Sequence, residues 1–372
     1  MSFCPHYDAG RCTSCTLIET PYGEQLLHKE RTLEAQLAPF GPYRFDTSVT
    51  SRPFGFRNKA KMVASDTKEG VVLGIGGMEL IDCALYNAPI RDALRIVQTW
   101  LRELGIRAYD IPRKKGELKY VLLTRAAVDG ALMLRFVLRS HGVIPRLKKA
   151  LPELYRALPA LACVSVNIQP MHKAVIEGEE EIVLSGVDHL REVFNGVVLH
   201  VRPKSFFQTN PAVAAELYKT AAEWVDALQP QSLWDLFCGV GGFALHCADD
   251  GRKVLGVELE PEAIASAEAA TREMGLQNVA FKALDIAGFS KASEGAPQCI
   301  IVNPPRRGLG EQLCAWLEAL LPGQIIYSSC NSATLAKDLV LLKHYRLERV
   351  QLFDMFPHTE HFETLVLLQR CD

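Results

Sequence analysis

The second half of the chain alternates short, strongly apolar runs with longer stretches whose apolar residues recur at helical spacing. Runs rich in Val, Ile and Leu predict buried β-strands, and the stretches between them predict amphipathic helices. The predicted strands cover residues 232–239, 253–260, 278–285, 298–305, 323–330, 346–356 and 363–370. The predicted helices cover residues 241–250, 261–275, 309–322 and 332–345.

This alternation is typical of a mainly parallel sheet with right-handed crossovers. Residues 346–356 and 363–370 follow each other without a helix between them, so the last strand is expected to run antiparallel. The second half therefore predicts an α/β domain with a Rossmann-like, seven-stranded, doubly wound sheet.

The first half is less regular and is typical of a separate α+β, mainly antiparallel domain. Residues 22–40 predict an amphipathic helix, and residues 91–105 predict another. The predicted strands cover residues 59–65, 70–76, 120–128, 131–138, 164–170, 172–178 and 196–203. We therefore expect two domains, residues 1–200 and residues 201–372, with the helix at 22–40 a candidate to pack on the second domain.

Composition agrees with a globular protein of more than one core. The chain has 372 residues, of which 48% are apolar and 23% charged. No apolar run is long enough to cross a bilayer, and the first residues lack the apolar core of a signal peptide. A cytoplasmic location is expected, where the 11 cysteines stay reduced. A monomer is favoured.

Charge is unevenly distributed although the formal net charge is only −2. Residues 41–150 hold 20 Lys and Arg against 10 Asp and Glu. Such a basic region is expected where a protein meets a phosphate backbone, although a solvated charged face gives the same count. The basic run at Arg113, Lys114, Lys115 and Lys119 is a candidate RNA-binding surface.

A glycine-rich turn, DLFCGVGGF at residues 235–243, joins a predicted strand to a predicted helix. Glycines let backbone N–H groups approach a ligand, but dinucleotide-binding enzymes share such turns. The next strand ends at Glu258, placed for the hydroxyls of a ribose, and the third ends at Asp285, within reach of an adenine amine. Because the spacing is G-x-G-G rather than G-x-G-x-x-G, the pattern resembles an S-adenosylmethionine methyltransferase sheet.

The fourth strand ends in IVNPPRRGLG, where Asn303 and two prolines form a stiff loop that faces the same pocket. Methyltransferases for exocyclic amines carry an aromatic residue after Asn-Pro-Pro, whereas Arg306 stands here. RNA cytosine-5 methyltransferases carry their nucleophilic cysteine after the paired prolines, and this chain does not. Both differences disfavour those chemistries.

The fifth strand ends at Cys330 and leads directly into a helix, IIYSSCNSATLAKDL. A helix N-terminus stabilises a thiolate, although most free cysteines are small apolar core residues. A thiolate that adds to carbon 6 of uracil makes carbon 5 reactive toward a sulfonium-bound methyl group. A base must then remove the proton from carbon 5, and Glu363, which opens the last strand, is the expected base.

The chain resembles the bacterial RNA uracil-5-methyltransferase family in five motifs and in their order. The motifs are FFQTN, DLFCGVGGF, NPPRRG, SSCNSATLAKDL and FPHTEHFET. The resemblance implies that S-adenosylmethionine contacts four residues, Gln208, Phe237, Glu258 and Asn303. Many members have aspartate where Asn303 stands. The resemblance also makes Cys330 the nucleophile and Glu363 the base. Arg306, His358 and His361 are candidates for orienting groups.

Three cysteines near the start, Cys4, Cys12 and Cys15, have the spacing C-x7-C-x2-C. In a reduced compartment this is typical of a metal site, and zinc is one alternative. The family resemblance implies a [4Fe–4S] cluster of structural role, with Cys83 as the fourth ligand. Cys163, in an apolar strand, is the competing candidate.

The family modifies transfer RNA or large-subunit ribosomal RNA, and its target uracil must lie in a loop or be flipped out of a duplex. The chain starts with the cysteine segment and lacks the small N-terminal β-barrel of some relatives. It therefore most resembles members that methylate uracil 747 of 23S rRNA. Another tRNA or rRNA uracil, an exocyclic-amine methyltransferase and a non-catalytic RNA-binding protein are the alternatives.

Overall fold

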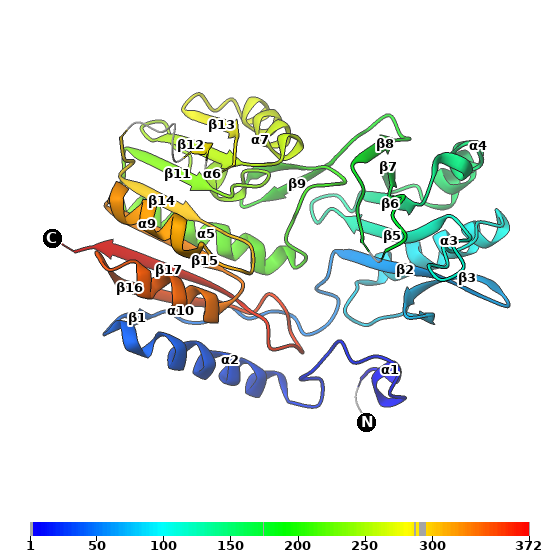
Figure 1. Ribbon diagram of the computed structural model, residues 1–372, viewed down its shortest axis with the longest axis horizontal. Coiled ribbons are helices and arrows are strands. Elements are labelled where there is room, and N and C mark those ends of the chain that lie inside the picture. Colours follow the sequence, from blue (N-terminus) through cyan, green and yellow to red (C-terminus); the bar gives the residue numbers. More distant parts are fainter. Residues whose placement is uncertain (1–2, 174, 286–287, 290–294, 372) are drawn as a thin grey trace. The chain divides into compact units, whose positions relative to one another are not determined.

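The computed structural model describes residues 3–173, 175–285, 288–289 and 295–371 (Figure 1). The chain forms two compact units. The first unit contains residues 1–12 and 54–192, and the second contains residues 13–53 and 193–372. The division into two functional domains at residue 200 stays a prediction.

In its described residues, the second unit is built on an eight-stranded sheet with the order β1-β16-β17-β15-β14-β11-β12-β13. Its strands are β1 (Arg44–Phe45), β11 (Ser232–Leu236), β12 (Lys253–Glu258), β13 (Val279–Ala283), β14 (Cys299–Val302), β15 (Gln324–Ser329), β16 (Tyr345–Phe353) and β17 (Glu363–Arg370). Only β17 runs antiparallel to its neighbours in this sheet. The seven predicted strands and the antiparallel last strand are confirmed, whereas β1 is too short to show a pattern in the sequence.

Helices cover both faces of this sheet. They are α2 (Tyr22–Leu37), α5 (Pro211–Leu228), α6 (Gly242–His246), α7 (Pro261–Met274), α9 (Gly310–Leu320) and α10 (Ser332–Leu341). The helix α2, followed by the short turn η1 (Ala38–Phe40), lies beside α10, which lies beside α9 (Figure 1). Leu33 and Leu37 of α2 join the same core as Leu317 and Leu335. The predicted helix at 22–40 therefore packs within the second unit, whereas α5 is a helix that the sequence pattern does not predict.

The first unit holds a seven-stranded sheet with the order β4-β3-β2-β5-β6-β7-β8 in its described residues. Its strands are β2 (Lys59–Thr67), β3 (Gly70–Ile75), β4 (Met78–Glu79), β5 (Leu118–Arg125), β6 (Leu132–Leu138), β7 (Leu161–Ile168) and β8 (Glu180–Val183). All neighbours are antiparallel except β6 and β7. The helices α3 (Ala88–Glu103) and α4 (Ile144–Ala157) bury their apolar faces in the core of this unit. This is the mainly antiparallel α+β architecture that the sequence predicts.

One predicted strand is wrong. Residues 172–173 and 175–178 form no strand, and β8 begins at Glu180 instead, while residue 174 lies outside the described residues. Asn167 of β7 pairs with this segment through its side chain, which donates to the Gly178 carbonyl at 3.0 Å and accepts from the Gly178 N–H at 2.7 Å. A side-chain amide therefore replaces the strand ladder at this point.

The remaining elements are short. They are α1 (Pro5–Asp8), η2 (His141–Val143), β9 (Leu190–Phe194) and β10 (Val197–Val201), the last two forming a two-stranded sheet. Across the described ranges, none of the helices has the length and apolar character that a membrane span requires.

Candidate active site

A cavity of about 1050 Å³ lies at the carboxyl ends of the parallel strands of the second unit. Open α/β sheets hold their ligands at this edge because the strand-to-helix loops converge there. Seven residues that the sequence analysis singles out line this one cavity: Gln208, Phe237, Glu258, Asp285, Asn303, Cys330 and Glu363. The fold thus brings together side chains from seven separate segments, while their chemical roles stay predictions.

The glycine-rich turn after β11 is fixed from both sides. Asp235 is fully buried and accepts a hydrogen bond of 2.9 Å from the backbone N–H of Ala244, and burial raises its pKa to about 8. The N–H of Gly239 donates to the Glu258 carboxylate at 3.1 Å. Phe237, at φ 64°, has a left-handed backbone that residues other than glycine rarely adopt. Such strain at a cavity wall is typical of a functional turn.

The other predicted cofactor contacts lie around this turn. Glu258 ends β12, and its second carboxylate oxygen accepts the N–H of Leu259 at 2.7 Å. Asp285 is exposed and accepts the N–H of Gly288 at 2.7 Å. Gln208 is buried, and the backbone N–H of Asn303 donates to the carbonyl of Leu236 on the neighbouring strand at 3.3 Å. The carboxylates of Glu258 and Asp285 are therefore held in place by backbone N–H groups.

Cys330 follows β15 and immediately precedes α10, as the sequence predicts. Burial and the nearby Glu363 carboxylate raise the pKa of the Cys330 thiol, whereas the guanidinium of Arg306, which donates a hydrogen bond to it, lowers that pKa. The raising effects are larger, so the thiol titrates above its ordinary value. The helix N-terminus alone therefore does not activate this thiol, and Arg306 supplies the positive charge that favours the thiolate.

The loop that carries Arg306 is tied to α10. Asn331 and Thr334 both donate hydrogen bonds of 3.2 Å to the carbonyl of Arg306. Asp338, buried on α10, accepts the N–H of Leu309 at 2.7 Å and the Tyr327 hydroxyl at 2.7 Å. These contacts hold Arg306 against the segment that begins with Cys330.

Glu363 begins β17 and is only 2% exposed. Ser328, on β15, donates a hydrogen bond of 2.7 Å to Oε1 of Glu363. Burial raises the pKa of Glu363 to about 7, and the Ser328 hydrogen bond opposes this shift. A carboxyl group with a pKa near 7 can take up and release a proton at physiological pH, which suits a general base.

Several residues that line the cavity are not predicted from the sequence. Phe206 is 74% exposed and lines the cavity, as do Phe356 and Trp316. Phe206 is the first of two adjacent phenylalanines in the FFQTN motif. Its position in that motif is the signal that could have identified it as a cavity residue. Ser328 stands two residues before Cys330, and the alternation of the predicted strand 323–330 puts both positions on one face, which is the signal that could have identified Ser328.

The two histidines of the HTEH segment have different surroundings. His358 is buried, burial lowers its pKa, and its ring contacts Gln25 and the carbonyl of Pro53. His361 is also shifted to a lower pKa by burial. The His358 ring therefore contacts other parts of the protein, Gln25 and Pro53, and His358 does not line the cavity.

In the first unit, Cys4, Cys12 and Cys83 come from two segments that a hydrogen bond holds together. Cys4 precedes α1, and the N–H of Cys12 donates to the carbonyl of His6 at 3.1 Å. The His6 ring contacts the Asp82 carboxylate at 2.8 Å, next to Cys83. Burial raises the pKa of Cys83, and the nearby charges of Cys4 and Cys12 raise it further. These three sulfurs are therefore close enough to influence one another.

Cys15 belongs to the second unit, where its carbonyl accepts the N–H of Ile18 at 3.4 Å. Cys163, the competing candidate, is buried on β7, and burial raises its pKa to about 11, as expected for a core thiol. Over residues 3–173, 175–285, 288–289 and 295–371, no group of three or more His, Cys, Asp or Glu is arranged to hold a metal ion. A cluster is therefore not shown by the structure.

Comparison with known proteins agrees with the site. A family model described as tRNA (uracil-5-)-methyltransferase matches residues 189–371. The chain is 52% identical to the 23S rRNA (uracil(747)-C(5))-methyltransferase RlmC of Shewanella amazonensis, covering 98% of this chain and 97% of the relative. It is 50% identical to the protein of the same name from Vibrio cholerae, covering 99% of each.

Among solved structures, the chain resembles the Pyrococcus abyssi tRNA (uracil-54, C5)-methyltransferase in complex with S-adenosyl-L-homocysteine. The TM-score is 0.79 at 26% identity, covering 95% of this chain and 85% of the other. The fold is thus that of an α/β methyltransferase. The chain belongs to the RNA uracil-5-methyltransferase family.

Proposed function

We propose that this enzyme methylates carbon 5 of a uridine in 23S rRNA, at uracil 747, with S-adenosylmethionine as the methyl donor. Relatives named 23S rRNA (uracil(747)-C(5))-methyltransferase are 52% and 50% identical over nearly the whole chain. Their names support 23S rRNA as the substrate and uracil 747 as the target. The observation that carries the chemistry is that a cysteine and a buried carboxylate, Cys330 and Glu363, line one cavity. Acting on rRNA, the protein would work in the cytoplasm.

The residues present fit S-adenosylmethionine. The Glu258 carboxylate at the end of the second parallel strand suits the ribose hydroxyls, and the exposed Asp285 carboxylate suits the adenine amine. Gln208, Phe237 and Asn303 line the same cavity. When bound, the donor supplies a methyl group on a positively charged sulfur.

The proposed reaction begins at Cys330. Its thiolate adds to carbon 6 of the uracil, and the electron pair of the 5,6 double bond becomes available at carbon 5, which takes the methyl group. The Glu363 carboxylate then removes the proton from carbon 5. The electron pair of that C–H bond re-forms the double bond and expels the Cys330 sulfur from carbon 6. The products are 5-methyluridine, S-adenosylhomocysteine, a regenerated thiolate and a protonated Glu363.

The charges around the cavity suit this order of events. Arg306 favours the thiolate needed for the first step, whereas a charged Glu363 disfavours it. Because burial raises the pKa of Glu363 to about 7, part of this carboxyl is charged at neutral pH and can accept the carbon-5 proton.

RNA binding is proposed for the first unit, whose basic run includes the exposed residues Arg113, Lys114 and Lys115. Lys119, which the sequence analysis adds to this run, does not belong to that surface. It is buried, and its ammonium donates to Gln169 and to the carbonyl of Met171. The ammonium of Lys119 therefore binds groups inside the first unit and does not face solvent.

A [4Fe–4S] cluster on Cys4, Cys12, Cys15 and Cys83 also remains a proposal. Its support is the cysteine spacing, the His6–Asp82 contact that holds two of the cysteine segments together, and the effect of Cys4 and Cys12 on the pKa of Cys83. The thiolates of a four-iron cluster bind different irons, so they lie farther apart than the ligands of a single ion. The cluster would be structural, because nothing in the methyl transfer requires electrons.

The function is tested by methyl transfer to 23S rRNA from a strain that lacks the modification. Incubation with labelled S-adenosylmethionine should introduce one 5-methyluridine, which mass spectrometry of nuclease fragments should place at position 747. A product in tRNA, or at another rRNA uracil, would contradict the proposed target. Methylation of an exocyclic amine, or an absence of donor binding by calorimetry, would contradict the chemistry.

A further inference from the structure

The nine-residue loop 354–362 connects β16 to β17 and ends directly at Glu363. The two strands pair up to Phe353 and Glu363, so Glu363 is the first residue after the loop. Phe356 of this loop lines the cavity. Any displacement of the loop would therefore move both a cavity wall and the proposed base.

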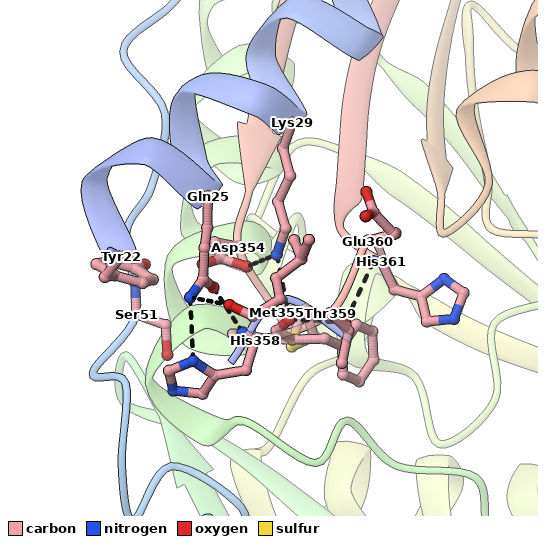
Figure 2. Close-up of polar contacts among 12 residues, drawn as sticks. Tyr22, Gln25, Lys29, Ser51, Asp354, Met355, His358, Thr359, Glu360 and His361 are labelled. Carbon is pink, nitrogen blue, oxygen red and sulfur yellow. Dashed lines mark hydrogen bonds and ion pairs between the residues drawn. The ribbon is translucent and has the colours of Figure 1, made fainter. Parts of the chain in front are cut away.

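The loop is held by α2, a helix more than 300 positions away in the sequence. Figure 2 shows the Gln25 and Lys29 side chains pointing from α2 toward the loop. The ammonium of Lys29 donates to Asp354 at 2.7 Å and to the carbonyl of Phe356 at 3.1 Å. The side chains of Lys29 and Asp354 are both fully buried.

Gln25 contacts the middle of the loop, at His358, through both polar atoms of its amide. Its Oε1 accepts the N–H of His358 at 2.8 Å, and its Nε2 faces Nδ1 of the His358 ring at 3.1 Å (Figure 2). The other ring nitrogen of His358 lies 2.9 Å from the carbonyl of Pro53, which can only accept. The ring proton must therefore be on Nε2, which leaves Nδ1 as an acceptor. The amide group of Gln25 also donates to the carbonyls of Leu17 at 3.0 Å and Thr20 at 2.8 Å, so it ties the segment before α2 to the His358 ring. His358 has φ 65°, a strained conformation that these contacts hold in place.

Further contacts come from the same part of the chain. The N–H of Asp354 donates to the carbonyl of Val49, and the N–H of Leu17 donates to the carbonyl of His358. Asn210, at the end of the FFQTN motif, donates to Ser51 at 2.8 Å and to the carbonyl of Met355 at 3.3 Å. The first five residues of the loop, 354–358, are thus held through their backbone by residues 17–53 and by a cavity motif.

A buried ion pair is a poor source of stability, because desolvation of two charges offsets much of their attraction. Its more useful effect is to favour one conformation, because any other arrangement leaves a buried charge unpaired. The conformation that Lys29 and Asp354 favour here is that of the loop leading to Glu363.

We propose that Gln25 and Lys29 are positioning residues that hold loop 354–362 so that Glu363 can reach the proton on carbon 5. This inference rests on the proposed function, in which proton removal follows methyl transfer. A looser loop should slow that second step more than the first. Methylated RNA should then remain attached to Cys330, which a general loss of folded enzyme would not cause.

The test compares Gln25→Met, which keeps the length of the side chain, with the double variant Lys29→Met/Asp354→Leu, which removes both buried charges together. A matched control is His28→Ala, which breaks an exposed contact of 2.9 Å between α2 and Glu360 of the same loop. Equal concentrations of folded enzyme, set by circular dichroism, are mixed with RNA and labelled S-adenosylmethionine. Covalent RNA–protein and free methylated RNA are separated on a denaturing gel.

We expect release of methylated RNA to slow by about tenfold or more in both variants, because displacement of a catalytic group by about 1 Å is costly. Formation of the methylated adduct should slow less, and His28→Ala should resemble the wild type. An unchanged ratio of adduct to free product in the folded variants would overturn the inference, as would failure of both variants to fold. If Glu363→Gln accumulates no adduct, the proposed function itself fails and this inference with it.

Discussion

Ser328 donates a hydrogen bond of 2.7 Å to Glu363, linking two neighbouring antiparallel strands beneath the cavity. The hydroxyl stabilises the charged form of a carboxyl group that burial would otherwise keep protonated. The Ser328–Glu363 pair therefore sets the pH range in which Glu363 can act as a base.

Replacement of Ser328 by alanine should move the acidic side of the pH–rate profile to higher pH. The carboxyl accepts a proton only when it is charged, so release of methylated RNA should fall as pH falls through the Glu363 pKa, about 7 in the native protein. Loss of the hydrogen bond raises that pKa further. The measurement is single-turnover product release as a function of pH, from about two units below to about two units above the Glu363 pKa. Ser48→Ala, which removes a similar hydroxyl-to-carboxylate bond at Glu30, should leave the profile unchanged.

Replacement of Glu363 by glutamine should separate methyl transfer from product release. The amide fills the same space but cannot take the carbon-5 proton, so turnover should fall by about 10²- to 10⁴-fold. Methylated RNA should accumulate in covalent linkage to the protein, visible as a labelled band on a denaturing gel. Glu223→Gln, an exposed carboxylate on α5, serves as the control. Normal turnover by the Glu363 variant would exclude this residue as the base.

Replacement of Arg306 by methionine should make Cys330 less reactive. The guanidinium lowers the pKa of the thiol, so its removal raises that pKa and decreases the thiolate fraction near pH 7. The rate of Cys330 alkylation by iodoacetamide, followed by peptide mass spectrometry as a function of pH, measures this directly. Arg307→Met changes the adjacent exposed cation and should have a smaller effect. Equal shifts in both variants would show that only the general positive potential matters.

The cysteine assignment predicts a metal content that depends on Cys83. Protein purified without oxygen should contain iron and acid-labile sulfide and be brown. Cys83→Ser should lose the colour, whereas Cys163→Ser, at a buried core thiol, should keep it. Colourless wild-type protein with one zinc per chain would contradict the cluster.

The fold of the second unit could be predicted because each of its longer strands is a distinct buried apolar run. The cavity residues could be located because they follow those runs, at the edge where parallel strands bind ligands. Cys330 and Glu363, for example, lie at the end of one strand and the start of another. The strand β1 has only two residues, which is too few for a periodic pattern. The altered pairing at Asn167 depends on a single side chain, which also leaves no pattern in the sequence.

The contacts of α2 could not be predicted for a different reason. Gln25 and His358 are 333 positions apart, and nothing in either segment identifies the other. Lys29 stands on an amphipathic helix, where a lysine is ordinarily assigned to solvent, yet its ammonium is fully buried against Asp354. Only the three-dimensional fold shows that the charge of this helix is directed at the loop before Glu363.

The central claim is that the sulfur of Cys330 bonds to carbon 6 of the target uracil, and RNA with 5-fluorouridine at position 747 tests it directly. Fluorine at carbon 5 leaves no proton to remove, so the adduct cannot be released. The wild-type protein with S-adenosylmethionine should form a covalent complex, mapped by mass spectrometry to the peptide containing Cys330, and Cys330→Ala should form none and should not methylate ordinary RNA. Methylation of ordinary RNA without any such adduct, or by the Cys330→Ala variant, would contradict the account.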